Sequence, residues 1–153
     1  MPIRGLLTAA LIVTVGATMS AGSASAQSKA VDLLDGRLTH KNFRSFDKFV
    51  ARHVDKVVGL KLAVKKSGSE DKLDASINDG QFVTYVMDAK EPKTEVVANS
   101  GFAERSGDVV FDGFYLVKYG GFRQGIHSYA LEPVDEAKVR LDPRRKVVTT
   151  RLK

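Results

Sequence analysis

The pattern of apolar and polar residues predicts a chain of short strands with one helix near its start. Between Thr39 and Asp55, apolar residues recur three or four positions apart, as on one face of an amphipathic helix. We expect this face to pack on the core of its own domain, with Thr39 or Asn42 as the helix cap. The apolar residues are Phe43, Phe46, Phe49, Val50 and Val54.

After the helix the period changes to two, which is typical of half-buried strands. Apolar residues alternate with small or charged ones over residues 58–65, and shorter β-prone segments follow at 73–79, 82–87, 94–98 and 109–111. Turn signals such as Asp79-Gly80 and Asn99-Ser100-Gly101 separate them. The sequence therefore predicts short strands joined by tight turns.

Two hairpins are predicted in the last third of the chain. Residues 114–119 and 126–131 form the first, joined by a loop over 120–125, and a symmetric register pairs Lys118 with His127 and Tyr119 with Ile126. Both faces of this hairpin are partly apolar, so we expect it to be central and covered on two sides. Residues 138–141 and 146–152 form the second hairpin, around the turn signal Asp142-Pro143.

A helix followed by Lys56-Val57-Val58-Gly59-Leu60-Lys61-Leu62 and several short strands resembles small OB-fold proteins of the bacterial cell envelope. The resemblance covers Phe43 to Pro133 and implies a sheet face that binds oligonucleotides, oligosaccharides or proteins. It transfers no binding residue to this chain. We predict a mainly β fold, a small antiparallel OB-like barrel with one amphipathic helix packed on it; the alternative is an α+β fold with a curved antiparallel sheet.

The first 26 residues have the pattern of a secretory signal peptide. A basic start at Arg4 precedes an uncharged, mostly apolar run over 6–19 and the small residues Ala24-Ser25-Ala26. The run is shorter than the roughly 20 residues that a membrane-spanning helix needs. We therefore expect cleavage after Ala26, a periplasmic or secreted protein without a stable transmembrane segment, and one β-rich domain over 27–153.

Composition narrows the possible chemistry. The chain has no cysteine, so disulfides, thiolate zinc sites and a cysteine nucleophile are excluded. Its three histidines, His40, His53 and His127, have no metal-binding spacing, and no phosphate loop or nucleophile elbow is present. We predict no metal site, no cofactor and no catalytic set. Acids that could still converge for a hydrolase include Asp74, Asp79, Asp88, Glu91 and Asp108.

Charge is concentrated at the C-terminus. The net charge of +6 falls to +5 without Arg4, and residues 138–153 hold seven basic residues against one acid. We expect either a polyanion-binding segment or an edge strand that lysine and arginine protect from aggregation. The polyanion-binding candidates are Arg140, Arg144, Arg145, Lys146 and Arg151.

The loop after Tyr119 is the second candidate binding site. Tyr119, Phe122, Arg123 and Gln124, with His127, offer stacking and hydrogen bonding at a hairpin tip, unless Phe122 folds back onto the domain. These features favour an exported, non-enzymatic binding domain for an envelope protein or polyanion, with nucleic acid a less favoured ligand. The alternatives are a small hydrolase for glycans or phosphoesters that uses His127, and an envelope assembly or scaffolding subunit.

Overall fold

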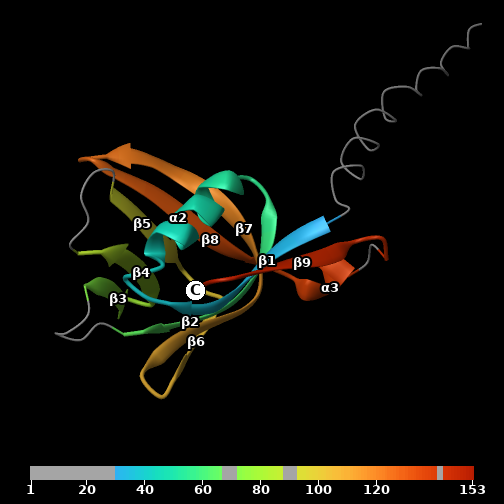
Figure 1. The fold of residues 1–153 in the computed structure, drawn as a ribbon, viewed down its shortest axis with the longest axis horizontal. Helices are drawn as coiled ribbons and strands as arrows, with labels where there is room; N and C mark the ends of the chain where they lie inside the picture. The colour runs from blue at the N-terminus through green and yellow to red at the C-terminus, as the bar shows by residue number, and fades with distance from the viewer. Residues whose placement is uncertain (1–29, 67–71, 88–92, 141–142) are drawn as a thin grey trace, which may run out of the picture.

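The computed structural model describes residues 30–66, 72–87, 93–140 and 143–153, and the predicted signal peptide lies outside them. Within these ranges the chain forms one nine-stranded sheet in the order β3-β4-β5-β8-β7-β2-β1-β9, with β6 paired to β7 (Figure 1). The elements are β1 (Ala30–Leu38), α2 (Phe43–Arg52), β2 (Val57–Lys65), β3 (Leu73–Asn78), β4 (Gln81–Val86), β5 (Lys93–Ala98), β6 (Phe102–Arg105), β7 (Asp108–Arg123), β8 (Ile126–Val134), α3 (Glu136–Arg140) and β9 (Lys146–Arg151).

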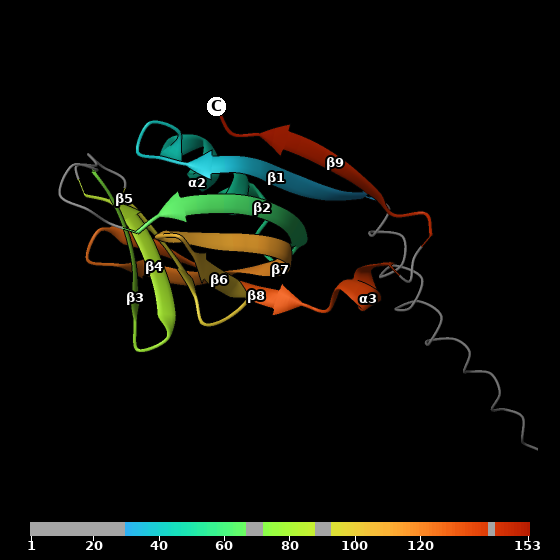
Figure 2. The same ribbon diagram turned by 90° about the horizontal axis from the view of Figure 1, so that it is seen from below.

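The mainly β character of the chain is confirmed, and an OB-like barrel is not. The sheet does not close, because β3 and β9 stand at its two ends without pairing to each other. The expectation of an antiparallel sheet is wrong, since β1 pairs parallel with both β2 and β9, and β5 pairs parallel with β8. The result is a curved, open, mixed sheet (Figure 2).

The predicted amphipathic helix is confirmed as α2, which connects the parallel strands β1 and β2. Its buried residues, Phe43, Phe46, Phe49 and Val50, belong to the predicted apolar face. The side chain of Asn42 does not cap the helix; its amide donates to the carbonyl of Arg37, and its oxygen accepts from the backbone N–H of Thr39. Asn42 therefore fixes the turn that leads from β1 into the helix.

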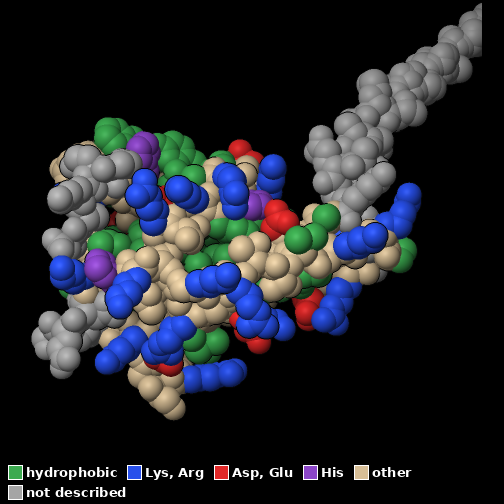
Figure 3. All heavy atoms as spheres, in the orientation of Figure 1, with side chains coloured by type: hydrophobic (Ala, Val, Ile, Leu, Met, Phe, Trp, Pro, Cys, Tyr) green, Lys and Arg blue, Asp and Glu red, His purple; other side chains and the backbone are tan. Residues whose placement is uncertain are grey.

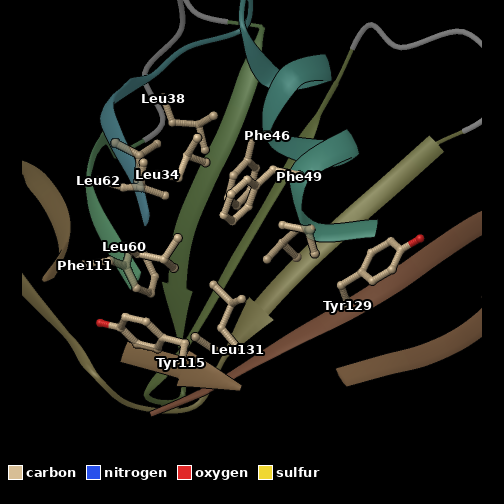
Figure 4. Close-up of a cluster of buried hydrophobic side chains, with 14 of the residues drawn as sticks. Leu34, Leu38, Phe46, Phe49, Leu60, Leu62, Phe111, Tyr115, Tyr129 and Leu131 are labelled. Carbon is tan, nitrogen blue, oxygen red and sulfur yellow. The ribbon is translucent and has the colours of Figure 1, made fainter. Parts of the chain in front are cut away.

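The core lies between α2 and the concave face of the sheet. Phe46 and Phe49 point from the helix toward Leu34 and Leu38 of β1 and toward side chains of the central strands (Figure 4). Phe46 and Phe49 are each only 2% exposed. Burial of a side chain of this size contributes about 1.5–3 kcal/mol, so α2 is an integral part of the fold.

The C-terminal hairpin predicted over 138–152 is wrong. Residues 136–140 form the short helix α3 instead of a strand, and β9 pairs with β1 from the other end of the chain. An Asp-Pro turn signal sets only local geometry, whereas the partner of a strand is decided by the sheet edge that is open to it.

Candidate functional site

The distal half of the β7–β8 hairpin carries the predicted loop residues, but in a different register. β7 runs through Arg123, so residues 120–123 belong to the strand and only Gln124-Gly125 form the turn. Both turn residues have positive φ, 55° and 78°, as a tight two-residue hairpin turn requires. The predicted symmetric pairing is therefore wrong.

A β-bulge at Tyr119–Gly121 shifts the register by one further residue within the hairpin. Tyr119 pairs with Tyr129 before the bulge, and Phe122 pairs with His127 after it. Side chains alternate across a strand, so residues three apart normally lie on opposite faces; one extra residue restores them to the same face. Gly121, with a φ of 105°, supplies the conformation that the bulge needs.

The bulge gathers four rings on the α2 side of the sheet, here called the ring cluster: Tyr119, Phe122, His127 and Tyr129. The ring centroids of Phe122 and His127 are 4.5 Å apart, and those of Tyr119 and Tyr129 are 5.3 Å apart. The Tyr119 hydroxyl lies 2.9 Å from His127 Nδ1, within hydrogen-bond distance. Each ring is held by at least one other ring.

The outer part of the ring cluster is open to solvent. Phe122 is 59% and Tyr119 is 45% exposed, whereas Tyr129 is 9% exposed and continues into the core. Burial raises the pKa of Tyr129, and the nearby Asp47 carboxylate of α2 raises it further. Figure 3 shows hydrophobic side chains and a histidine gathered over this end of the molecule. Phe122 therefore contacts His127 but does not fold back into the core.

The two polar members of the predicted site lie at the tip. Arg123 and Gln124 are exposed, at the end of β7 and in the turn respectively. The structure thus brings Tyr119, Phe122 and His127 into one contact group and places Arg123 and Gln124 beside it along the chain. Tyr129, which joins the group, was missed because its place depends on the bulge.

The C-terminal basic residues are dispersed over several elements. Arg140 on α3 forms an ion pair of 2.8 Å with Glu136, and Arg151 on β9 lies 3.9 Å from Asp35. Arg145 lines a cavity beside β1, and Arg144 and Lys146 are exposed. The second candidate site is therefore a dispersed set of cations, and the acidic partners of Arg140 and Arg151 already neutralise part of its charge.

A cavity of about 520 Å³ at the C-terminal end of α2 contains a histidine–aspartate pair. His53 is 8% exposed, and its Nδ1 and Nε2 lie 2.6 Å from the Phe49 carbonyl and from Asp32 Oδ2. Each ring nitrogen thus already lies within hydrogen-bond distance of a protein group, so neither is left for a reacting molecule. These contacts give His53 a structural role at the end of α2, and its partner on β1 was not predicted.

The acids considered for a hydrolase have separate surroundings. Asp108 holds Arg37 in a two-bond ion pair, and Asp74 lies beside the Tyr85 hydroxyl. Asp79 lies in the β3–β4 turn, while Asp88 and Glu91 are outside the described residues. Over the described part of the chain, no three metal-ligating side chains come together.

Comparisons with protein-family models, with curated proteins and with solved structures find no match to this chain. Among the described residues, no helix is long and apolar enough to cross a membrane.

Proposed function

We propose that the protein is an exported, non-enzymatic domain that binds a partner in the cell envelope through the ring cluster. The observation that carries this proposal is the exposure of Phe122 and Tyr119 on rings that are already fixed by their neighbours. Full burial of one such ring by a partner would contribute about 1.5–3 kcal/mol. Because the rings are held in place, little side-chain entropy is lost on binding.

The surroundings of His127 support binding over hydrolysis. Its neighbours are Phe122 and Tyr119, both uncharged, and its Nδ1 faces a hydroxyl. A hydrolase that used His127 would need a carboxylate or an activated water beside it. Export of the chain is argued from the pattern of residues 1–26 alone.

Chemical-shift mapping tests this proposal. The ¹⁵N-labelled protein is titrated with lipopolysaccharide micelles, single-stranded DNA and an acidic glycan, each at low and high salt. Shifts centred on residues 119–129 with any of these probes support a site at the ring cluster. Shifts confined to residues 138–153 and lost at high salt would move the site to the C-terminal segment and contradict the proposal.

A pair of variants separates the ring cluster from general surface hydrophobicity. Phe122→Ala should weaken binding of the probe at least tenfold, because the removed ring is worth about 1.5 kcal/mol or more when buried. Met87→Ala removes an exposed hydrophobic side chain, 50% exposed, from the end of β4 and serves as the control. Equal losses in both variants would contradict a specific site.

A second function, assembly with another protein, is supported by β9. Among the described residues this strand pairs only with β1, all six of its residues are exposed, and Val147 and Val148 are each 52% exposed. An open strand edge offers unpaired N–H and C=O groups to an incoming strand. Light scattering tests this: a stable oligomer that Val147→Lys with Val148→Lys dissociates supports assembly, and a monomer at all concentrations contradicts self-assembly.

A further inference from the structure

The outer face of α2 carries a line of cations. Arg44, Lys48 and Arg52 recur four residues apart, so they lie along one side of the helix, spanning about 12 Å at 1.5 Å per residue. All three are exposed, and they lie opposite the buried phenylalanines of the same helix. We call them the α2 cations; Lys41 before the helix and Lys56 after it are exposed as well.

The α2 cations have no acidic partners among the described residues. The ion pairs within those ranges involve other cations, such as Arg37 with Asp108 and Lys118 with Asp55. Asp47, the one acid of the helix, is partly buried on its flank near Tyr129. The outer side of α2 is therefore a positively charged ridge, and no acidic side chain of the described residues forms an ion pair with its cations.

This ridge and the ring cluster lie on the same side of the sheet. Tyr129 belongs both to the core beneath α2 and to the ring cluster, and the effect of Asp47 on its hydroxyl places the flank of the helix nearby. Figure 3, which views the molecule from the helix side, shows lysine and arginine side chains around α2 next to the hydrophobic group over β7 and β8. One face thus combines cations with exposed aromatic rings.

We infer that this face docks on an anionic lipid surface, with the α2 cations on the headgroups and Phe122 inserted between them. This inference rests on the proposed function and names the chemistry of its partner. Clusters of lysine and arginine on an amphipathic helix attract anionic lipids, and aromatic rings are favoured at the membrane interface.

The shape of the face favours a lipid surface over single-stranded nucleic acid. A nucleic-acid strand binds in a basic groove where bases stack on open ring faces. Here the cations follow the outer side of a helix that lies across the sheet, and the rings of Phe122 and His127 are in tilted contact, 4.5 Å apart (Figure 1). A charged ridge beside a hairpin tip can meet a flat, extended surface.

Vesicle co-sedimentation tests the inference. The protein is purified from a bacterial host, and its binding to vesicles of phosphatidylglycerol with phosphatidylcholine is compared with binding to phosphatidylcholine alone. Each cation near an anionic surface contributes about fivefold to affinity, so Arg44→Gln with Lys48→Gln and Arg52→Gln should weaken binding at least tenfold. Phe122→Ala should weaken it as well, and high salt should release the protein because it screens the charges.

A matched variant controls for net charge. Arg105→Gln with Lys61→Gln and Lys65→Gln removes the same number of exposed cations from β6 and β2, away from the C-terminal basic residues. Binding that survives in this control but falls in the α2 variant supports the inference. An equal loss in both variants overturns it, since net charge alone would then explain binding.

Two further outcomes separate this inference from the proposed function. In the first, the wild-type protein does not bind anionic vesicles, but the acidic glycan changes the chemical shifts of residues 119–129. The lipid inference is then overturned, and the binding site at the ring cluster is supported. If single-stranded DNA binds through the α2 cations and vesicles do not, the ligand is a nucleic acid and the lipid inference is likewise overturned.

Discussion

Tyr115 on β7 joins the core to the β5–β6 turn. Its hydroxyl donates to the carbonyl of Gly101, and its side chain is 2% exposed. Burial raises the pKa of Tyr115 to about 12, above its ordinary value of 10. The phenol therefore stays neutral in the folded protein at a pH where it ionises in the unfolded chain.

Tyr115→Phe should change stability in a pH-dependent way. At pH 7 the variant should lose about 1 kcal/mol, the usual contribution of one hydrogen bond. The neutral Tyr115 phenol contributes its full stabilisation of the wild type below pH 10. Because the folded-state pKa is about 12, this contribution is lost as the pH rises toward 12. Urea denaturation at pH 7 and pH 11 should show the gap between the two proteins shrinking; a constant gap would contradict the assigned cause.

His53 and Asp32 tie the end of α2 to β1, so their removal should affect stability. His53→Ala removes the hydrogen bond to the Phe49 carbonyl and should cost about 1–3 kcal/mol, because this acceptor is buried. Asp32→Ala should cost less, since the Asp32 side chain is 46% exposed. A double-mutant cycle by urea denaturation measures the coupling, and additive losses would show that the two residues act independently.

At the scale of elements, the β-bulge in β7 decides which side chains form the ring cluster. Deleting Gly120 should remove the extra residue and leave Tyr119 and Phe122 two positions apart on a regular strand, still on one face. The ring contact between Phe122 and His127 should therefore persist, as nuclear Overhauser effects between the rings will show. Loss of that contact in the deletion variant would mean that the strand pairing does not continue in register once the bulge is removed.

Gly120→Ala is the matched control for this deletion. A Cβ atom at position 120 would lie 3.4 Å from the Ser128 carbonyl oxygen, which is ordinary contact, and the backbone there does not have positive φ. The substitution keeps the number of residues in β7. Its ring contacts should match those of the wild type.

Periodicity predicted α2 well and β1 not at all. The helix has five apolar residues at helical spacing, whereas the β1 sequence AVDLLDGRL mixes aspartate and glycine with leucine and alternates poorly. β1 is a strand because it has neighbours on both sides, β2 and β9, and no local window contains that information. The predicted residues of the ring cluster were found by type, but their shared face depends on one bulge.

At the scale of the whole molecule, the proposed export signal makes a direct prediction. Expression in a bacterial host should yield protein that begins at Gln27 in the periplasmic fraction, because the small residues before it match a cleavage site. Intact mass spectrometry identifies the first residue. A chain that begins at Met1 and stays in the cytoplasmic fraction would contradict the proposal that the partner lies in the cell envelope.

The pairing of β1 with β9 has a consequence for how the chain acquires its fold. Ala30 lies beside Lys146 and Asp35 beside Arg151, so nearly all the described chain separates the partners. Contacts between such distant residues form slowly, because a long loop must close before any pairing is gained. A chain still emerging from the ribosome cannot complete this part of the sheet, and β1 keeps one side open until residues 146–151 have been made.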